Sequence, residues 1–203
     1  MKYTILILLF LIPIFCFTQT AKQYLELGVK KKMEYDSESA LQYFDKAIAL
    51  DSKLYSAYWN RGSTKWSLFD YKGAMEDLNI AIELNPSIDA AYVDRGRTKF
   101  SLQDYRGAIK DYDKAIQLSP NSSTYFFMRA EAKDQIHEFT SAVIDYDKSI
   151  TLNRIKSLTG DSYFNRGIDK LKLGKKIEGC LDLSKAGELG NDKAYDYIKK
   201  YCQ

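Results

Sequence analysis

Few side chains in this sequence of 203 residues are suited to acid–base, nucleophilic or metal chemistry. The sequence has one histidine, His137, and three cysteines, Cys16, Cys180 and Cys202. The cysteines lie too far apart in sequence for a zinc cluster, and no nucleophile–base pair or glycine-rich phosphate loop is present. We therefore expect a protein that is not an enzyme and that holds neither a metal ion nor a cofactor.

Charged side chains are more numerous, and their balance excludes a second class of function. Lys and Arg total 30, Asp and Glu total 27, and the formal net charge is +3. Because the basic residues are spread along the chain instead of clustered, we expect no nucleic-acid partner. With 45% hydrophobic and 28% charged residues, the composition is that of an ordinary globular protein.

Arginines and aspartates recur at a nearly constant interval. Most members of each set are 34 residues apart: Arg61, Arg95, Arg129 and Arg166, and Asp77, Asp111, Asp145 and Asp182. Carboxylates that recur in this way suit solvated faces or structural pairs better than a single catalytic site. The elements that position them must therefore repeat along the chain.

The first twenty residues have the features of a signal peptide. One basic residue, Lys2, precedes the uncharged run TILILLFLIPIFCF at 4–17, which is shorter than the ~20 residues of a membrane span. We expect cleavage near residues 18–21, export to a periplasmic or secreted location, and no integral membrane span in the mature chain. Two alternatives are weaker: Phe15 disfavours lipidation at Cys16, and the short run disfavours an uncleaved anchor.

The rest of the chain repeats every 34 residues. Small residues mark the repeat (Gly28, Gly62, Gly96, Ala130; Ala40, Ala74, Ala108, Ala142; Ala47, Ala81, Ala115, Ser149), and Pro86 and Pro120 share the same spacing. We predict units at about 21–54, 55–88, 89–122, 123–156 and 160–190. A three-residue insertion falls in a predicted loop at 153–161.

Each unit has the pattern of two helices. In the third unit, apolar and small residues have helical spacing over 92–102 and again over 108–118, with a turn at 103–105. Pro120 stops the second helix, because proline lacks the amide proton and its ring clashes in a helix interior. Small residues are expected where two helices cross closely.

This pattern resembles the tetratricopeptide repeat. The resemblance covers about residues 21–189 and includes an aromatic column and a large apolar or aromatic column: Tyr24, Tyr58, Tyr92, Phe126 and Tyr163, and Phe44, Leu78, Tyr112, Tyr146 and Leu183. It implies an all-α fold, a right-handed superhelical solenoid of about five helix-turn-helix units with a concave groove lined by the first helices. Residues 191–203 are predicted to form a C-terminal capping helix, with Ala194, Ile198 and Tyr201 on one side.

Within this frame, the arginine and aspartate columns occur together. The first unit lacks both, with Leu27 and Tyr43 in their places. We predict one ion pair across each helix pair: Arg61–Asp77, Arg95–Asp111, Arg129–Asp145 and Arg166–Asp182. The favoured interpretation is structural, with mutually satisfied charges that set helix register; the alternative is a basic binding stripe.

Two cysteines belong to the last elements of the array. Cys180 lies early in the last second helix and Cys202 at the end of the capping helix. A turn at Gly190 and Asn191 would fold these helices antiparallel and bring both cysteines to the same end. We predict a Cys180–Cys202 disulfide, with two buried free thiols as the alternative.

The resemblance also indicates where a partner would bind. Carried onto this chain, the groove side of the first helices includes Trp59, Ser63, Trp66, Val93, Arg97, Phe100, Phe127 and Glu131. Trp59 and Trp66 are seven residues apart and share a helix face. The alternative is that these aromatics pack against neighbouring helices. Of the positions that clamp a peptide carboxylate in some relatives, only Asn60 matches, which disfavours chaperone-tail binding.

These observations predict an exported scaffold that mediates protein–protein interaction through its groove. One alternative is a polysaccharide or cell-wall binding module, because exposed tryptophans can stack on sugar rings. Another is a non-catalytic accessory subunit of an envelope assembly. Self-association through the ends of the array is a further possibility that the sequence leaves open.

Overall fold

A computed structural model describes residues 19–152 and 156–203, and in these ranges the chain is all-α. The eleven helices are α1 (Ala21–Met33), α2 (Ser37–Leu50), α3 (Tyr55–Ser67), α4 (Tyr71–Leu84), α5 (Asp89–Ser101), α6 (Tyr105–Leu118), α7 (Ser123–Gln135), α8 (Phe139–Leu152), α9 (Lys156–Lys172), α10 (Lys176–Glu188) and α11 (Lys193–Tyr201). Most of the predicted signal peptide, residues 1–18, lies outside the described residues.

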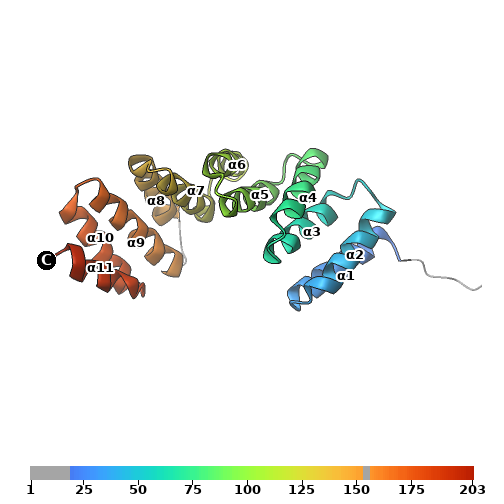
Figure 1. The fold of residues 1–203 in the computed structure, drawn as a ribbon, viewed down its shortest axis with the longest axis horizontal. Coiled ribbons are helices and arrows are strands. Elements are labelled where there is room, and N and C mark those ends of the chain that lie inside the picture. The colour runs from blue at the N-terminus through green and yellow to red at the C-terminus, as the bar shows by residue number, and fades with distance from the viewer. Residues whose placement is uncertain (1–18, 153–155) are drawn as a thin grey trace, which may run out of the picture.

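The helices form five pairs that follow one another along a curved row, from α1–α2 at one end to α9–α10 at the other (Figure 1). Within the row, each second helix packs against the first helix of the next pair, and α11 packs on α10. First helices also contact one another, α1 with α3, α3 with α5 and α7 with α9, which places them on the inner side of the curve. The predicted all-α array of paired helices is confirmed.

The turns inside the first four pairs share one backbone geometry. Asp36, Asp70 and Asp104 cap the second helices, because their side chains accept hydrogen bonds from the backbone N–H three residues ahead. The residue before each cap has a left-handed backbone with φ of 61–63°: Tyr35, Phe69, Gln103 and, before Glu138, His137. Side chains other than glycine rarely adopt this conformation, so the turns are sharp and locally strained.

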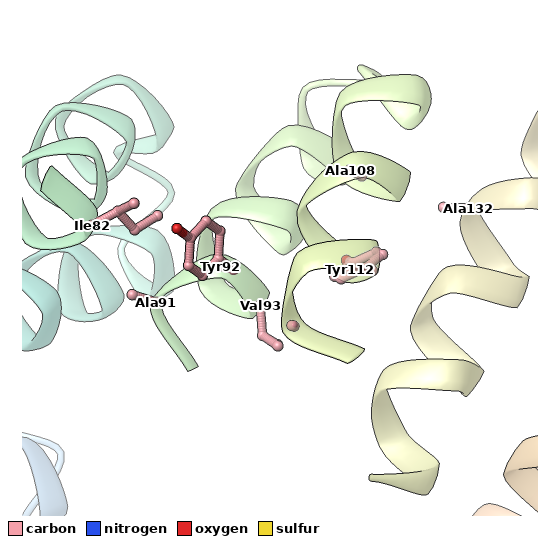
Figure 2. Close-up of a cluster of buried hydrophobic side chains, with 8 residues drawn as sticks. Ile82, Ala91, Tyr92, Val93, Ala108, Tyr112 and Ala132 are labelled. Atoms are coloured by element: carbon pink, nitrogen blue, oxygen red, sulfur yellow. The ribbon is translucent and has the colours of Figure 1, made fainter. Parts of the chain in front are cut away.

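Small residues in the first helix receive large residues from the second. A Cβ atom built on Gly96 would lie 2.6 Å from Cε1 of Tyr112, so only glycine leaves room for that ring. The large residues of this column, Phe44, Leu78, Tyr112, Tyr146 and Leu183, are at most 2% exposed. Figure 2 shows how the core continues between pairs, with Ile82 of α4 pointing towards Tyr92 of α5 and Tyr112 of α6 lying between α5 and α7.

The inserted residues lengthen a helix. α9 has 17 residues, whereas α1, α3, α5 and α7 have 13 each. Residues 156–161, which we predicted as loop, belong to the start of α9, where the Ser162 hydroxyl bonds both the Leu158 carbonyl and Ser149 of α8. In the part of the chain that the structure describes, no helix is long and apolar enough to cross a membrane.

The array ends at α11, which covers the last pair. Ala194 is fully buried against α10, and the ring of Tyr197 meets Phe164 of α9 edge-on at 5.1 Å. Cys180 and Cys202 form a disulfide with their Cα atoms 5.7 Å apart, so the end of α11 is tied to the start of α10.

Candidate binding groove

The repeated arginines occupy the same position in four consecutive pairs. Each guanidinium donates two parallel hydrogen bonds to one aspartate of the facing second helix, at 2.8–3.0 Å from Nε and 2.5–2.6 Å from Nη2. The pairs are the four within-unit pairs expected from the sequence: Arg61–Asp77, Arg95–Asp111, Arg129–Asp145 and Arg166–Asp182. The aspartates are at most 6% exposed. Such bidentate bonds between charged groups are the strong ones.

A lysine one turn after each arginine completes the arrangement. Lys65, Lys99, Lys133 and Lys170 donate to the same four aspartates at 2.7–2.9 Å. On its other side, each guanidinium lies over the aromatic ring three residues earlier, at 4.9–5.6 Å from the ring centre. Because each arginine and its aspartate bind one another through two hydrogen bonds and the aspartate also binds a lysine, these columns form a structural ladder.

Each arginine also reaches the preceding pair of helices. Its Nη1 donates to a side chain on the previous second helix: Asp45 for Arg61, Asn79 for Arg95, Asp113 for Arg129 and Asp147 for Arg166. Sequence reasoning missed these partners. A signal was present, because Asp45 stands 16 residues before Arg61 and Asp77 stands 16 residues after it.

The first pair replaces the ladder with aromatic packing. Where later units have an aspartate, Tyr43 stacks on Tyr24 with ring centres 6.2 Å apart, and Lys46 lies over both rings. Lys31, in the lysine column, pairs with Glu34 at 2.8 Å. The first pair therefore has no arginine to hold its two helices together.

The predicted groove residues divide into two groups. Trp59 packs against the core and donates from Nε1 to Asp94 at 2.8 Å, while Val93 is only 7% exposed. Ser63 accepts a hydrogen bond from Lys32, and the Phe127 ring packs edge-on against Tyr146 at 5.8 Å. These four residues are occupied by contacts within the protein.

The other four predicted residues converge on one pocket between α3, α5 and α7. We call it the Trp66 pocket; it has a volume of about 150 Å³ and is lined by Trp66, Arg97, Phe100, Ser101, Tyr112, Met128 and Glu131. Arg97 lies over the Trp66 ring at 4.0 Å and pairs with Asp94 at 3.5 Å. Trp66 Nε1 is buried and has no hydrogen-bond partner among the described residues.

Sequence reasoning placed Trp66, Arg97, Phe100 and Glu131 in the groove but missed Ser101, Tyr112 and Met128. Tyr112 comes from a second helix, α6, and enters the pocket because Gly96 lets its ring pass between the helices. Met128 lies one position from the helix face that the repeat pattern assigned to the groove. Neither residue type marks a binding site when it stands alone in a sequence.

Carboxylates of the groove differ in how well they are compensated. Burial raises the pKa of Asp94, although Trp59, Arg97 and Lys32 all act to lower it. Asp134 and Asp169 share the ammonium group of Lys172, yet burial and the neighbouring Asp134 raise the pKa of Asp169 to about 7. Burial, Asp161 and Asp134 raise the pKa of Glu131 to about 7. The C-terminal half of the groove is therefore acidic.

Two wider hollows lie on the same row of first helices. One, of about 460 Å³, is lined by Val29, Lys32, Met33, Tyr35 and Asn60 at the N-terminal end. The other, of about 330 Å³, is lined by Ile168, Leu171, Lys172, Tyr197 and Tyr201 at the C-terminal end. With the Trp66 pocket, the row of first helices therefore has a hollow at each end and one in the middle.

Comparisons with known proteins agree with this architecture. Residues 55–88 and 89–122 each match a family described as the tetratricopeptide repeat. No curated protein matches the chain by sequence.

Solved structures extend the likeness over most of the chain. The structure of MamA protein is 22% identical and covers 86% of this chain and 94% of its own, with a TM-score of 0.74. YrrB, described as a TPR protein with an unusual peptide-binding site, is 19% identical and covers 89% and 92%, with a TM-score of 0.77. At these identities the likeness establishes the fold.

A third structure is more similar in sequence over a shorter stretch. The first TPR of Spaghetti (RPAP3), bound to the HSP90 peptide SRMEEVD, is 28% identical and covers 58% of this chain and 94% of its own, with a TM-score of 0.57. The family matches fall on the two central pairs, and the same helix pair recurs from α1 to α10. The chain therefore contains tetratricopeptide repeats, and proteins of this repeat family are typically non-catalytic scaffolds for protein–protein interaction.

Proposed function

We propose that this protein is an exported scaffold that holds an extended segment of a partner protein along the inner face of its first helices. The Trp66 pocket carries the proposal. Its aromatic walls offer apolar contact area, and the buried Nε1 of Trp66 has no acceptor among the described residues. A buried donor without a partner is costly, and an acceptor of a bound segment would recover that cost where side chains of the pocket move aside to admit it.

Peptide binding by relatives supports a ligand of this kind. The RPAP3 repeat domain is bound to a peptide, and YrrB is described by its peptide-binding site. The chemistry must differ from a carboxylate clamp, because Asn60 alone matches the clamp positions and Asp94 stands where a cation would be needed. The partner segment is therefore expected to bind through side chains instead of its C-terminal carboxylate.

The alternative of a polysaccharide ligand receives less support. Sugar rings stack on open faces of tryptophan, but Trp59 is packed against the core and Arg97 covers one face of Trp66. We therefore favour a protein partner, which is also compatible with a non-catalytic accessory role in an envelope assembly.

Export rests on two observations. The apolar run 4–17 is typical of a signal peptide, and the Cys180–Cys202 disulfide suits an oxidising compartment. Thr20 caps α1 together with Gln23, so cleavage before Thr20 would leave the first helix fully capped. Cell fractionation and N-terminal sequencing of the mature protein test this: a cytoplasmic protein that retains Met1 would contradict export.

Site-directed photocrosslinking in the protein's own cells tests the groove. A photoreactive residue at Ser101, in the Trp66 pocket, should form an adduct with a partner, whereas the same residue at exposed Ser184 of α10 should not. The adduct should disappear when Trp66→Ala is added in the same chain. Equal adducts from both positions, or an adduct at Ser101 that survives Trp66→Ala, would place binding elsewhere.

A further inference from the structure

Glu131 is the one carboxylate of the Trp66 pocket, and it lacks a counter-ion. Among the described residues, no hydrogen-bond donor or cation is within bonding distance of its side chain, whereas Asp94 has Trp59 and Arg97. Arg97, the only basic residue of the pocket, is already engaged by Asp94 and the Trp66 ring. The pocket therefore contains an uncompensated negative group.

Charged groups from neighbouring helices increase this imbalance. The carboxylates of Asp134 on its own helix and Asp161 on α9 act on Glu131, and Arg97 of α5 and the buried phenol of Tyr112 of α6 line the same pocket. Lys172 is held between Asp134 and Asp169, and even so Oδ2 of Asp169, a residue 1% exposed, has no partner. Lys172 is therefore taken up by Asp134 and Asp169 and does not serve as a counter-ion for Glu131.

We infer that the Trp66 pocket takes a lysine or arginine side chain of the bound segment, with Glu131 as the acceptor of its cationic group. This inference rests on the proposed function and names the chemistry of its ligand. The apolar stem of such a side chain would lie against Trp66, Phe100 and Met128, and the cationic group would meet Glu131 at the far wall. A volume of about 150 Å³ suits one long side chain and excludes a folded element.

The opposite charge would be rejected by the same groups. An aspartate or glutamate at this position would meet Glu131 and the field of Asp134 and Asp161 without a free cation to compensate it. An uncharged side chain would leave Glu131 half-buried and without a counter-ion. Specificity for a basic residue then comes both from attraction to Glu131 and from repulsion of acidic competitors.

Selection from random peptides tests directly whether the protein prefers a ligand with a basic residue. The exported, disulfide-bonded protein is used to select from a library of random twelve-residue peptides, and the peptides retained are sequenced. We expect lysine or arginine at one fixed position. Retained peptides without such a basic position, or with an acidic one, overturn the inference but leave the groove as a peptide site. No retained peptide, or peptides that bind equally well to the Trp66→Ala protein, overturns the proposed function itself.

One selected peptide then tests the role of Glu131 with matched changes on both molecules. Glu131→Gln should weaken binding by about tenfold or more, as should replacement of the peptide's basic residue by uncharged norleucine; the two losses should not add. Glu76→Gln, on the exposed side of α4, is the control and should leave binding unchanged. An unchanged dissociation constant for both the Glu131→Gln protein and the norleucine peptide overturns the inference.

Binding should also release protons. The pKa of Glu131 is raised to about 7 in the free protein, so it holds a proton in part near neutral pH, and a bound cation would favour the ionised form. Calorimetry in two buffers with different ionisation enthalpies should therefore detect net release of protons on binding at pH 7. The Glu131→Gln protein should show less release. Identical proton release by both proteins would exclude Glu131 as the acceptor.

Discussion

Removal of the Asp111 carboxylate by Asp111→Ala tests the structural ladder most directly. Asp111 is 3% exposed and accepts hydrogen bonds from Arg95 at 2.6 and 3.0 Å and from Lys99 at 2.8 Å. After the change, Arg95 keeps Asn79 and the face of Tyr92, whereas Lys99 keeps no carboxylate. Two cations whose side chains are about one fifth exposed then share a site that has lost its only negative charge.

The expected cost is large for a single substitution. Removing one partner of a buried ion pair destabilises a protein by about 3–5 kcal/mol, and the partial exposure of Arg95 and Lys99 favours the lower end. With a denaturant dependence of about 2 kcal/mol/M, a loss of about 3 kcal/mol lowers the urea midpoint by about 1.5 M. Unfolding followed by circular dichroism, in the same buffer and salt as the parent, measures this shift.

Asp113→Ala in the same helix is the matched control. Asp113 also accepts from an arginine, Arg129, at 2.7 Å, but its side chain is 52% exposed. Its loss should cost about 0–1 kcal/mol, because water compensates an exposed charge. An Asp111→Ala protein as stable to urea as the parent, or one no less stable than Asp113→Ala, would refute the assignment of the ladder as a buried structural network.

Three further changes follow from the geometry. Gln103→Gly should raise the free energy of unfolding by roughly 0.5–1 kcal/mol, because glycine adopts the φ of 63° without strain; Gln135→Gly, at a helical position, should lower it, and urea unfolding compares the two. Cys180→Ser with Cys202→Ser should lower stability by about 3 kcal/mol, and a reductant should then have no further effect on the urea midpoint. The pKa of Glu131 is about 7 in the folded protein, against an ordinary value of 4.5 in the unfolded chain. The folded protein therefore binds this proton more tightly, and the contribution of Glu131 to stability falls as pH rises from 4.5 to about 7. Glu131→Gln should therefore gain stability over the parent towards pH 7, and a constant difference from pH 4.5 to 7 would contradict the raised pKa.

The parts of the fold that follow from repetition were predictable from the sequence. Gly96 and Tyr112 occupy columns that recur in every unit. The place where the two helices cross in one unit therefore predicts where they cross in the other units. The arginine and aspartate columns were similarly informative, because both are missing from the first unit. Regular spacing carries this information even where individual helix propensities are weak.

Features that break the repetition were harder to predict. Tyr35 and Phe69 adopt left-handed backbones that the residue types do not announce, since aromatic side chains are rare there. The segment before Gly160, which we predicted as loop, adds residues to the start of α9, and its residue types are compatible with a helix. Trp59 packs against the core and bonds to Asp94 instead of lining the groove. This depends on how two neighbouring pairs stack, which the pattern within one unit does not specify.

Because each arginine also bonds to the preceding pair, the two ends of the array are held differently. Arg61 holds α1–α2 through Asp45 alone, and that pair has Leu27 where the others have an arginine of their own. The opposite end is fastened covalently through Cys180 and Cys202. Unfolding by heat, or by a protease that pulls on the chain, should therefore start with the first helix pair. It should then continue pair by pair towards the disulfide-bonded carboxyl terminus.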